Sequence, residues 1–223
     1  MELTPRLALA AELCRGCRSV IDVGCDHAYL CLTLAERGAE RAYASDIRPG
    51  PLTAARAHIR ACGMEDRVQA VLCPGLEAFG PEDADTIVIC GMGGEMIASI
   101  LEKAPWTRMG RHRLVLQPMT CGDRLRKWLR EAGYTIEQEA LAREGRRLYT
   151  LLQVRGNGVG DSCGGENFYL FTQKLTEDPL FPSFVGQQRE KYRKARAGKA
   201  LAGLDTSLED AVLRRLEEFC HGA

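Results

Sequence analysis

The stretch Ser19-Val-Ile-Asp-Val-Gly-Cys-Asp-His-Ala-Tyr29 decides the fold. Its first half is a short, mainly β-branched run that ends at Gly24, which predicts a buried strand. A helical pattern follows as far as Arg37 and is stopped by Gly38, a residue that commonly ends helices. A strand that turns through glycine into a helix is the first unit of an open α/β sheet. In such sheets ligands bind beyond the carboxyl ends of the strands.

The turn after this strand carries one glycine instead of three. Dinucleotide-binding folds use the pattern G-x-G-x-x-G, so that a pyrophosphate can lie on the helix N-terminus. Here Gly24 is followed by Asp26 and His27. An acid in this place repels a pyrophosphate but suits a cationic sulfonium and its amino group. The sequence therefore disfavours a nicotinamide-dependent dehydrogenase, and a turn with a purely structural role stays open as an alternative.

Strands and helices alternate through the first 133 residues. We expect strands at 19–24, 41–46, 68–72, 85–90 and 114–117. Helices are expected at 4–16, 49–62, 94–103 and 123–132, beside the one that follows the first strand and ends at Arg37. Such alternation requires a parallel sheet with helices on both faces. Two further strands, 134–141 and 147–154, are separated only by a short turn and form a hairpin. The expected fold is α/β and Rossmann-like, with a seven-stranded mixed sheet that ends in an antiparallel hairpin.

The last third of the chain has a different pattern. Residues 156–165 are glycine-rich and polar, as in a linker. Helices are expected over about 185–201 and 206–220, the second opened by a capping box of Ser207 and Asp210, and together they form a helical hairpin. The predicted division is a main domain over 1–155, a linker over 156–167 and a helical appendage over 168–223.

The composition is that of an ordinary globular protein. The chain has 223 residues, 45% of them hydrophobic, and 30 basic residues balance 30 acidic ones, so net charge excludes no partner. Most of the ten cysteines lie in apolar runs, and the pair Cys14 and Cys17 lacks a second pair at zinc-ribbon spacing, so we expect no metal. We see no signal peptide and no apolar run of membrane-spanning length, so we expect no membrane partner and a place in the reducing cytoplasm.

Two further segments are candidates for a ligand site. Asp46 ends the second predicted strand, about twenty residues after the glycine turn, where a carboxylate can accept both ribose hydroxyls of an adenosine. The segment Cys90-Gly-Met-Gly-Gly-Glu95 closes the fourth strand and opens a helix. It offers amide donors at a helix N-terminus and the adaptable side chain of Met92. A tight turn that needs glycine only for packing is the alternative.

These segments resemble the bacterial tRNA (adenine-22-N1)-methyltransferase family, whose members are class I, Rossmann-like methyltransferases. The resemblance runs in order across about residues 5–155, and its segments are 21–30, 50–55, 91–94, 114–118 and 126–129. The pair Asp-His-Ala-Tyr and Gly-Met-Gly-Gly is its most specific part. The C-terminal coiled coil of the family is similar to the predicted helical appendage.

The resemblance implies S-adenosylmethionine as cofactor and methyl transfer to N1 of an adenine in tRNA. It implies cofactor contacts at Asp22, Gly24, Cys25, Asp46, Ile47, Gly75, Leu76, Gly91 and Met92. The catalytic candidates are Asp26, which would stabilise the cationic product or accept the amine proton, and His27 and Tyr29, which would orient the base or the cofactor. Where the family has Gly-Asp-Gly-Leu after the third strand, this chain has Cys73-Pro-Gly-Leu76, so an acid for the cofactor's adenine amine is missing.

Two stretches are rich in basic residues. Residues 189–199 hold six against Glu190, and residues 108–130 hold seven against Asp123. Solvated helix faces are the plain alternative, as is neutralisation by acidic residues of the last helix. Together with the fold, the stretches favour phosphate contacts. The expected tRNA contacts are Arg6, Gly93, Gly94, Arg126, Lys127, Arg189, Arg193, Lys194 and Arg196.

Other functions stay open at this point. They are a methyltransferase acting on another RNA base, a small-molecule methyltransferase, which would need a closed apolar lid, and a non-catalytic RNA-binding relative. The last would be expected to lose Gly24 or Asp46, and the chain has both. A monomer is favoured, although the sequence does not determine the oligomeric state.

Overall fold

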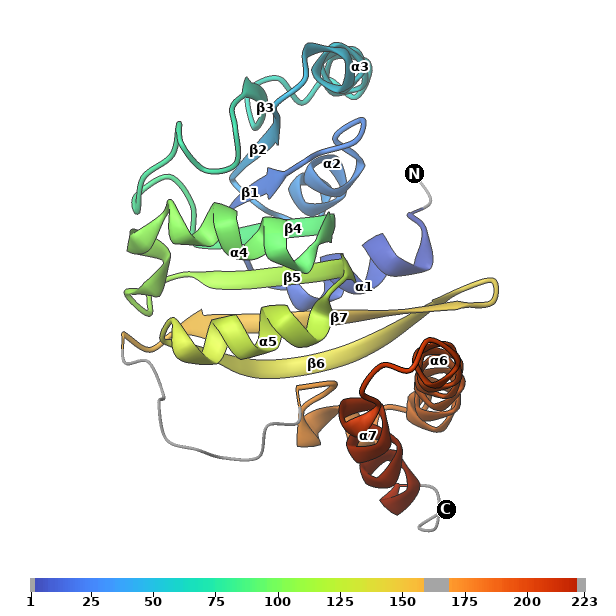
Figure 1. Ribbon diagram of the computed structural model, residues 1–223. Coiled ribbons are helices and arrows are strands. Elements are labelled where there is room, and N and C mark those ends of the chain that lie inside the picture. The colour runs from blue at the N-terminus through green and yellow to red at the C-terminus, as the bar shows by residue number, and fades with distance from the viewer. Residues whose placement is uncertain (1–2, 159–168, 220–223) are drawn as a thin grey trace. The chain divides into compact units, whose positions relative to one another are not determined.

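The computed structural model describes residues 3–158 and 169–219, which form two compact units. The first unit ends at Thr172 and is an α/β domain (Figure 1). Its elements are α1 (Pro5–Leu13), β1 (Ser19–Val23), α2 (Tyr29–Glu36), β2 (Arg41–Asp46), α3 (Pro49–Ala61), β3 (Val68–Leu72), β4 (Thr86–Gly93), α4 (Gly94–Glu102), the 3₁₀ helix η1 (Pro105–Arg108), β5 (Arg113–Thr120), α5 (Gly122–Glu131), β6 (Tyr134–Glu144) and β7 (Arg147–Gly156).

The seven strands form one sheet in the order β3-β2-β1-β4-β5-β7-β6. Strands β1 to β5 are parallel, and β7 runs antiparallel to both β5 and β6. The predicted seven-stranded mixed sheet with a terminal hairpin is confirmed. The strand order reverses between β1 and β4, and a crevice for a ligand opens at such a reversal.

Helices cover both faces of the sheet (Figure 1). Successive strand residues point to opposite faces, so fully buried Val20 packs with residues of α1, α2 and α3, while fully buried Ile21 packs with residues of α4 and α5. Both faces are therefore apolar, which explains why the parallel strands are continuous hydrophobic runs and do not alternate.

Helix α1 begins as the sequence predicts. Thr4 is its N-cap, and the hydroxyl oxygen accepts from the backbone amide of Leu7 at 3.5 Å, with Pro5 in the first turn. Strands β4 and β5 continue about three residues beyond their predicted ends. Their glycine and proline residues suggested turns, but pairing between the two strands extends them. The pairing contains a bulge, because the register shifts between Cys90 and Met92.

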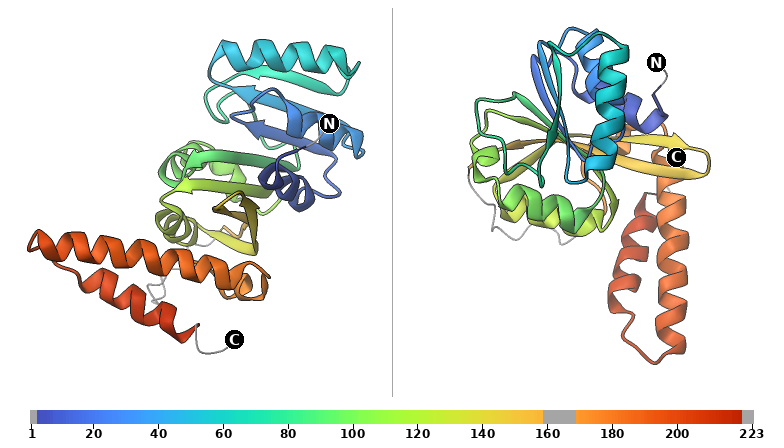
Figure 2. Two further views of the ribbon diagram at one scale, coloured as in Figure 1. Left: turned by 90° about the vertical axis from the view of Figure 1, so that its right-hand side faces the viewer. Right: turned by 90° about the horizontal axis from the view of Figure 1, so that it is seen from above.

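The second unit begins at Gln173 and is a helical hairpin. It contains the 3₁₀ helix η2 (Gln173–Glu177), α6 (Phe181–Leu201) and α7 (Ser207–Glu218), and α6 and α7 lie side by side (Figure 2). The predicted capping box was wrong by one position. Thr206 is the N-cap of α7 and its hydroxyl donates to Asp210 at 2.9 Å, while Ser207 bonds to Asp205.

The predicted linker lies, from residue 159 on, outside the described residues. Across the parts of the chain that the structure describes, none of the helices has the length and apolar character needed to cross a bilayer.

Candidate functional site

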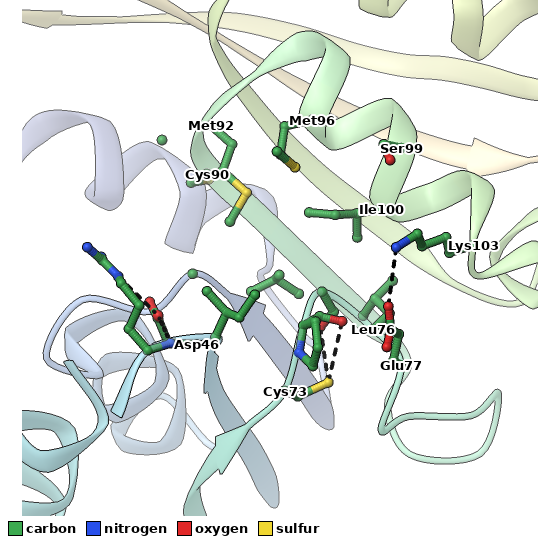
Figure 3. A pocket seen from close by; sticks show the side chains of 17 residues that line it. Asp46, Cys73, Leu76, Glu77, Cys90, Met92, Met96, Ser99, Ile100 and Lys103 are labelled. Carbon is green, nitrogen blue, oxygen red and sulfur yellow. Dashed lines mark hydrogen bonds and ion pairs between the residues drawn. The ribbon is translucent and has the colours of Figure 1, made fainter. Parts of the chain in front are cut away.

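A cavity of about 450 Å³ opens at the carboxyl ends of β1, β2 and β4, between the turn after β3 and helix α4 (Figure 3). The sequence-predicted cofactor residues that line it are Gly24, Asp46, Ile47, Gly75, Leu76, Gly91 and Met92. The other two, Asp22 and Cys25, are buried in β1 and in the turn after it. The structure thus brings together segments that are up to 68 residues apart in the chain, counted from Gly24 to Met92.

The backbone conformation favours glycine at position 24, because its φ of +78° is one that other residues rarely adopt. A Cβ there would meet only the terminal methyl group of Met92, a flexible side chain that can move aside. The turn is held by the backbone amide of Gly24, which donates to the carbonyl oxygen of Ser45 at 2.8 Å. The turn therefore presents bare peptide groups to the cavity.

Asp46 supplies a carboxylate at the end of β2. Only 7% of the residue is exposed, and its Oδ1 atom accepts from the backbone amide of Arg48 at 2.7 Å. Ile47 beside it is 65% exposed and adds an apolar surface to the cavity wall. An anchored carboxylate next to an apolar side chain suits a ligand with vicinal hydroxyls and a flat base.

Asp22 lies behind this wall and is almost fully buried. Desolvation, followed by repulsion from Asp46, raises the pKa of Asp22 to about 7. Burial and the same aspartates raise the pKa of the neighbouring Cys25 thiol to about 12, so that thiol is no nucleophile at neutral pH. A positive charge in the cavity would stabilise the ionised form of Asp22.

The turn after β3 closes the far end of the cavity. Cys73 organises it, because its sulfur accepts from the amide of Ala78 at 3.1 Å and lies 3.7 Å and 3.6 Å from the carbonyl oxygens of Pro74 and Gly75. Pro74 lines the cavity at the position where the resembling family has an acid. An ion pair of Glu77 with Lys103, the residue that follows α4, lies at the same rim with a distance of 3.3 Å (Figure 3).

The predicted catalytic residues Asp26 and His27 lie in the turn between β1 and α2, and Tyr29 begins α2; their side chains do not line the cavity. Asp26 is well exposed and its Oδ1 lies 3.2 Å from Nε2 of His27. His27 and Ala28 both have left-handed backbone, with φ of +59° and +60°, which costs about 1–2 kcal/mol per residue. Strain of this kind persists where surrounding contacts hold it.

His58 of α3 is one of those contacts, and the sequence analysis missed it. Its Nδ1 lies 3.1 Å from the carbonyl oxygen of His27, so Nδ1 carries the hydrogen and donates. The rings of His27, Tyr29 and His58 form a cluster with centroid distances of 5.1–5.5 Å. The cluster gives the turn a fixed aromatic surface.

The segment after β4 is held by a second residue that the sequence analysis missed. Gln117 of β5 is fully buried, and its Oε1 accepts from the amide of Gly91 at 3.0 Å and from Nη1 of Arg6 at 2.9 Å. Arg6, predicted as a tRNA contact, is thus bound to the interior of the domain. Gly94 is buried, and a Cβ there would collide with the carbonyl of Cys121, so packing explains this glycine.

The prediction that Arg126 contacts tRNA is wrong. The side chain is 6% exposed and forms an ion pair with fully buried Glu139, whose other oxygen accepts from the amide of Thr172 at 2.7 Å. Lys127 is exposed, with Glu131 at 3.9 Å. Arg111 and Arg124 form ion pairs as well, with acids outside the basic stretch, so residues 108–130 do not form one basic face.

The basic residues of α6 are partly neutralised by ion pairs. Neutralisation by acidic residues of the last helix was one of the alternatives to phosphate contacts. Arg196 pairs with Asp210 of α7, Lys199 with Glu209 at 2.8 Å, and Lys194 with Glu190 at 3.1 Å. Arg189 and Arg193, the other two predicted contacts on this hairpin, lie on the same helix.

A cationic spot remains on this hairpin. Arg193 and Arg214 are exposed and flank Arg196 around a hollow of about 590 Å³, which the acids Asp210 and Glu217 also line, so that three cations stand against two anions.

The fold and the cavity define the class I, Rossmann-like methyltransferase architecture. Comparison with known proteins agrees, since residues 3–152 match the family described as methyltransferase domain. The chain therefore belongs to that methyltransferase domain family.

Two relatives are more specific. The chain is 33% identical over 153 residues to the tRNA (adenine(22)-N(1))-methyltransferase of Bacillus subtilis, a match that covers 68% of this chain and 64% of that protein, less than two thirds of its length. The crystal structure of Streptococcus pneumoniae Sp1610 in complex with S-adenosyl-L-methionine superposes with a TM-score of 0.80 at 31% identity, over 98% of this chain and 99% of that one.

A third comparison covers nearly the whole chain of a named enzyme. The Bacillus subtilis M1A22 tRNA methyltransferase has a TM-score of 0.73 at 26% identity, over 97% of this chain and 95% of that one. The similarity thus extends through both units of the chain.

Proposed function

We propose that the protein transfers a methyl group from S-adenosylmethionine to N1 of an adenine in tRNA, at position 22. The observation that carries the proposal is the cavity between Gly24, Asp46 and Met92. It lies at the strand-order reversal, in a fold whose similar proteins are named for this reaction or bind this cofactor. A tRNA substrate puts the expected place of action in the cytoplasm, and a monomer stays a prediction.

The residues present fit the cofactor. Asp46 would accept from the ribose hydroxyls, Ile47 and Leu76 would pack on the adenine, and the bare backbone at Gly24 would admit the amino-acid end. Asp22 adds negative potential behind that end, which favours an ammonium or sulfonium. When bound, S-adenosylmethionine supplies an electrophilic methyl group.

The target nitrogen needs little chemical activation. N1 of adenine carries a lone pair at neutral pH, so the main tasks of the protein are alignment and the exclusion of water. Exposed Asp26 would stabilise the cationic product or accept the amine proton, and the rings of His27 and Tyr29 would orient the base. N1 lies on the Watson–Crick edge, so the adenine has to leave its pairing or stacking first.

Contacts to the tRNA backbone are assigned to the basic residues of α6. Arg193 is the main candidate because it lies at the cationic spot, and Arg189, Lys194 and Arg196 accompany it. Lys127 and Gly93 are weaker candidates. Lys127 lies at an exposed position of α5, and Gly93 follows Met92, which lines the cavity. Phosphate contacts of this kind make binding sensitive to salt.

Methylation of bulk tRNA tests the function directly. Unmodified tRNA is incubated with the protein and with cofactor carrying a labelled methyl group, then digested with nuclease and analysed by mass spectrometry. The expected product is 1-methyladenosine in the fragment containing position 22, and reactions without cofactor or with tRNA carrying guanosine at position 22 serve as controls. Label in another nucleoside would reject the base assignment, and no label in tRNA would reject the substrate.

A further inference from the structure

We propose that Gln117 is a positioning residue, which fixes the β-bulge at Gly91 and with it the wall of the cavity that faces the reacting methyl group. The inference rests on the proposed function, since it takes the cavity as the cofactor site. Gln117 itself does not line the cavity and touches no ligand there.

The geometry of the bulge creates the need for such a residue. Cys90 of β4 is paired with Gln117 of β5, and the register then shifts before Met92, so Gly91 is left without a place in the ladder. The Oε1 atom of Gln117 accepts a hydrogen bond from the backbone amide of Gly91 at 3.0 Å, while its Nε2 donates to the carbonyl oxygen of Pro118 at 2.9 Å.

A cation holds the same oxygen from the other side. Nη1 of Arg6 donates to Oε1 of Gln117 at 2.9 Å, and a charged donor makes the stronger kind of hydrogen bond. Arg6 is itself fixed, because its backbone amide donates to Glu144 at 3.0 Å and its guanidinium lies 5.3 Å from the ring centroid of Tyr149. Gln117 of β5 binds the amide of the bulge, and Arg6 of α1, which contacts β6 and β7, holds Gln117 in place.

The bulge determines where the next side chain lies. Gly91 has a φ of +80°, and Met92 after it reaches across the cavity to the place where a Cβ on Gly24 would be (Figure 3). Gly24 and Met92 both line the cavity, and the spacing between them depends on the Gly91 backbone. Asp46, which would anchor the cofactor under the proposed function, lies on another strand. Loss of the Gln117 contacts should therefore reduce alignment more than affinity.

Two substitutions of similar size separate these effects. Gln117→Met removes the acceptor and should lower kcat by roughly 10- to 100-fold, while the Kd for cofactor stays within about threefold. Gln117→Glu keeps an acceptor for both Gly91 and Arg6 but loses the donor to the Pro118 carbonyl oxygen, so its kcat should lie between that of Gln117→Met and that of the parent. Calorimetry measures the Kd, and steady-state tRNA methylation measures kcat and KM.

A matched control separates positioning from stability. The hydroxyl of fully buried Thr107 shares a hydrogen bond of 2.7 Å with Tyr134, in the same unit and away from the cavity. Thr107→Val should lower the melting temperature about as much as Gln117→Met and leave kcat unchanged. If Gln117→Met keeps the parent kcat, or if Gln117→Glu is as slow as Gln117→Met, the proposal is overturned.

Amide hydrogen exchange gives a second measurement that needs no tRNA. Peptides covering residues 88–94 should exchange slowly in the parent and in Gln117→Glu, and faster in Gln117→Met. Equal exchange in all three proteins would reject the positioning role, even if the tRNA assay fails. A parent that binds cofactor, shows this pattern and methylates no tRNA would reject the proposed function alone.

Discussion

Pro74 stands where the resembling family has an aspartate, and it lines the cavity beside Gly75. Pro74→Asp should tighten S-adenosylmethionine binding by about 0.5–1.5 kcal/mol, because a carboxylate there can accept from the adenine amine. Calorimetry measures the change. An analogue with hypoxanthine in place of adenine is the control, since it lacks the amine and should gain nothing. Equal tightening of both ligands, or of neither, would contradict the assignment of this end of the cavity to adenine.

Asp22 makes stability depend on pH. Its pKa is about 7 in the folded protein against an ordinary value of 3.8, so between these values the folded state binds more protons than the unfolded state. The free energy of unfolding of the ligand-free protein should therefore fall as pH rises from about 4 to about 7. Asp22→Asn removes this dependence, which urea unfolding at pH 5 and pH 8 would show. A variant with the same decline as the parent would refute the attribution to Asp22.

Asp26 is exposed, so its replacement tests chemistry more than folding. Asp26→Asn should lower kcat by roughly 10- to 100-fold and leave cofactor affinity within a few fold, because the charge acts on the product cation or the amine proton. Single-turnover kinetics and calorimetry measure the two quantities. Asp66→Asn, at an exposed position outside the cavity lining, is the control. Lost cofactor binding together with normal single-turnover chemistry would make Asp26 a ligand anchor instead.

At the scale of elements, the order of strands and helices could be predicted because it depends on local patterns. The β-branched segment 19–23 and the glycine that ends the next helix, Gly38, can be recognised from neighbouring residues alone, without knowledge of what they pack against. The bulge at Gly91 was not predictable, since its bond to Gln117 joins residues 26 positions apart. The contact of His58 with His27 was not predictable for the same reason, because the two residues lie 31 positions apart. Side-chain contacts between elements arise only when the sheet has formed.

Arg126 shows the limit of charge counting. Seven basic residues in one stretch favoured an RNA contact, but the side chain joins α5 to β6 through Glu139, and neither is exposed. Arg126→Ala should destabilise the protein by about 3–5 kcal/mol, because it leaves the Glu139 charge buried without its partner. Urea unfolding measures this value, and Lys127→Ala, at the exposed neighbouring position, should change it by less than about 0.5 kcal/mol. Equal effects of the two variants would contradict the buried ion pair.

At the scale of the whole molecule, the helical hairpin provides the surface that we propose binds tRNA. Its charge is divided between pairs such as Lys199–Glu209 and the exposed residues Arg193 and Arg214. Changing Arg193 and Arg214 together to Ala should weaken tRNA binding and reduce the slope of log Kd against log salt by about one for each phosphate that the variant no longer neutralises. Filter binding at several salt concentrations measures the slope.

Lys199→Ala removes one charge that is already paired and should leave the slope nearly unchanged. If the double variant keeps the slope of the parent, the hairpin is a scaffold that does not bind phosphates.

Helix α1 packs against β6 and β7, and Arg6 is bonded to Glu144, 138 residues further along the chain. During synthesis, α1 therefore leaves the ribosome long before its docking surface exists. At roughly 5–20 residues per second the delay is on the order of ten seconds. The residues that line the cavity all precede Ala104 in the chain. A nascent chain arrested before Tyr134 thus contains every residue of the ligand cavity, while the part of α1 that packs against β6 and β7 still lacks its partner strands.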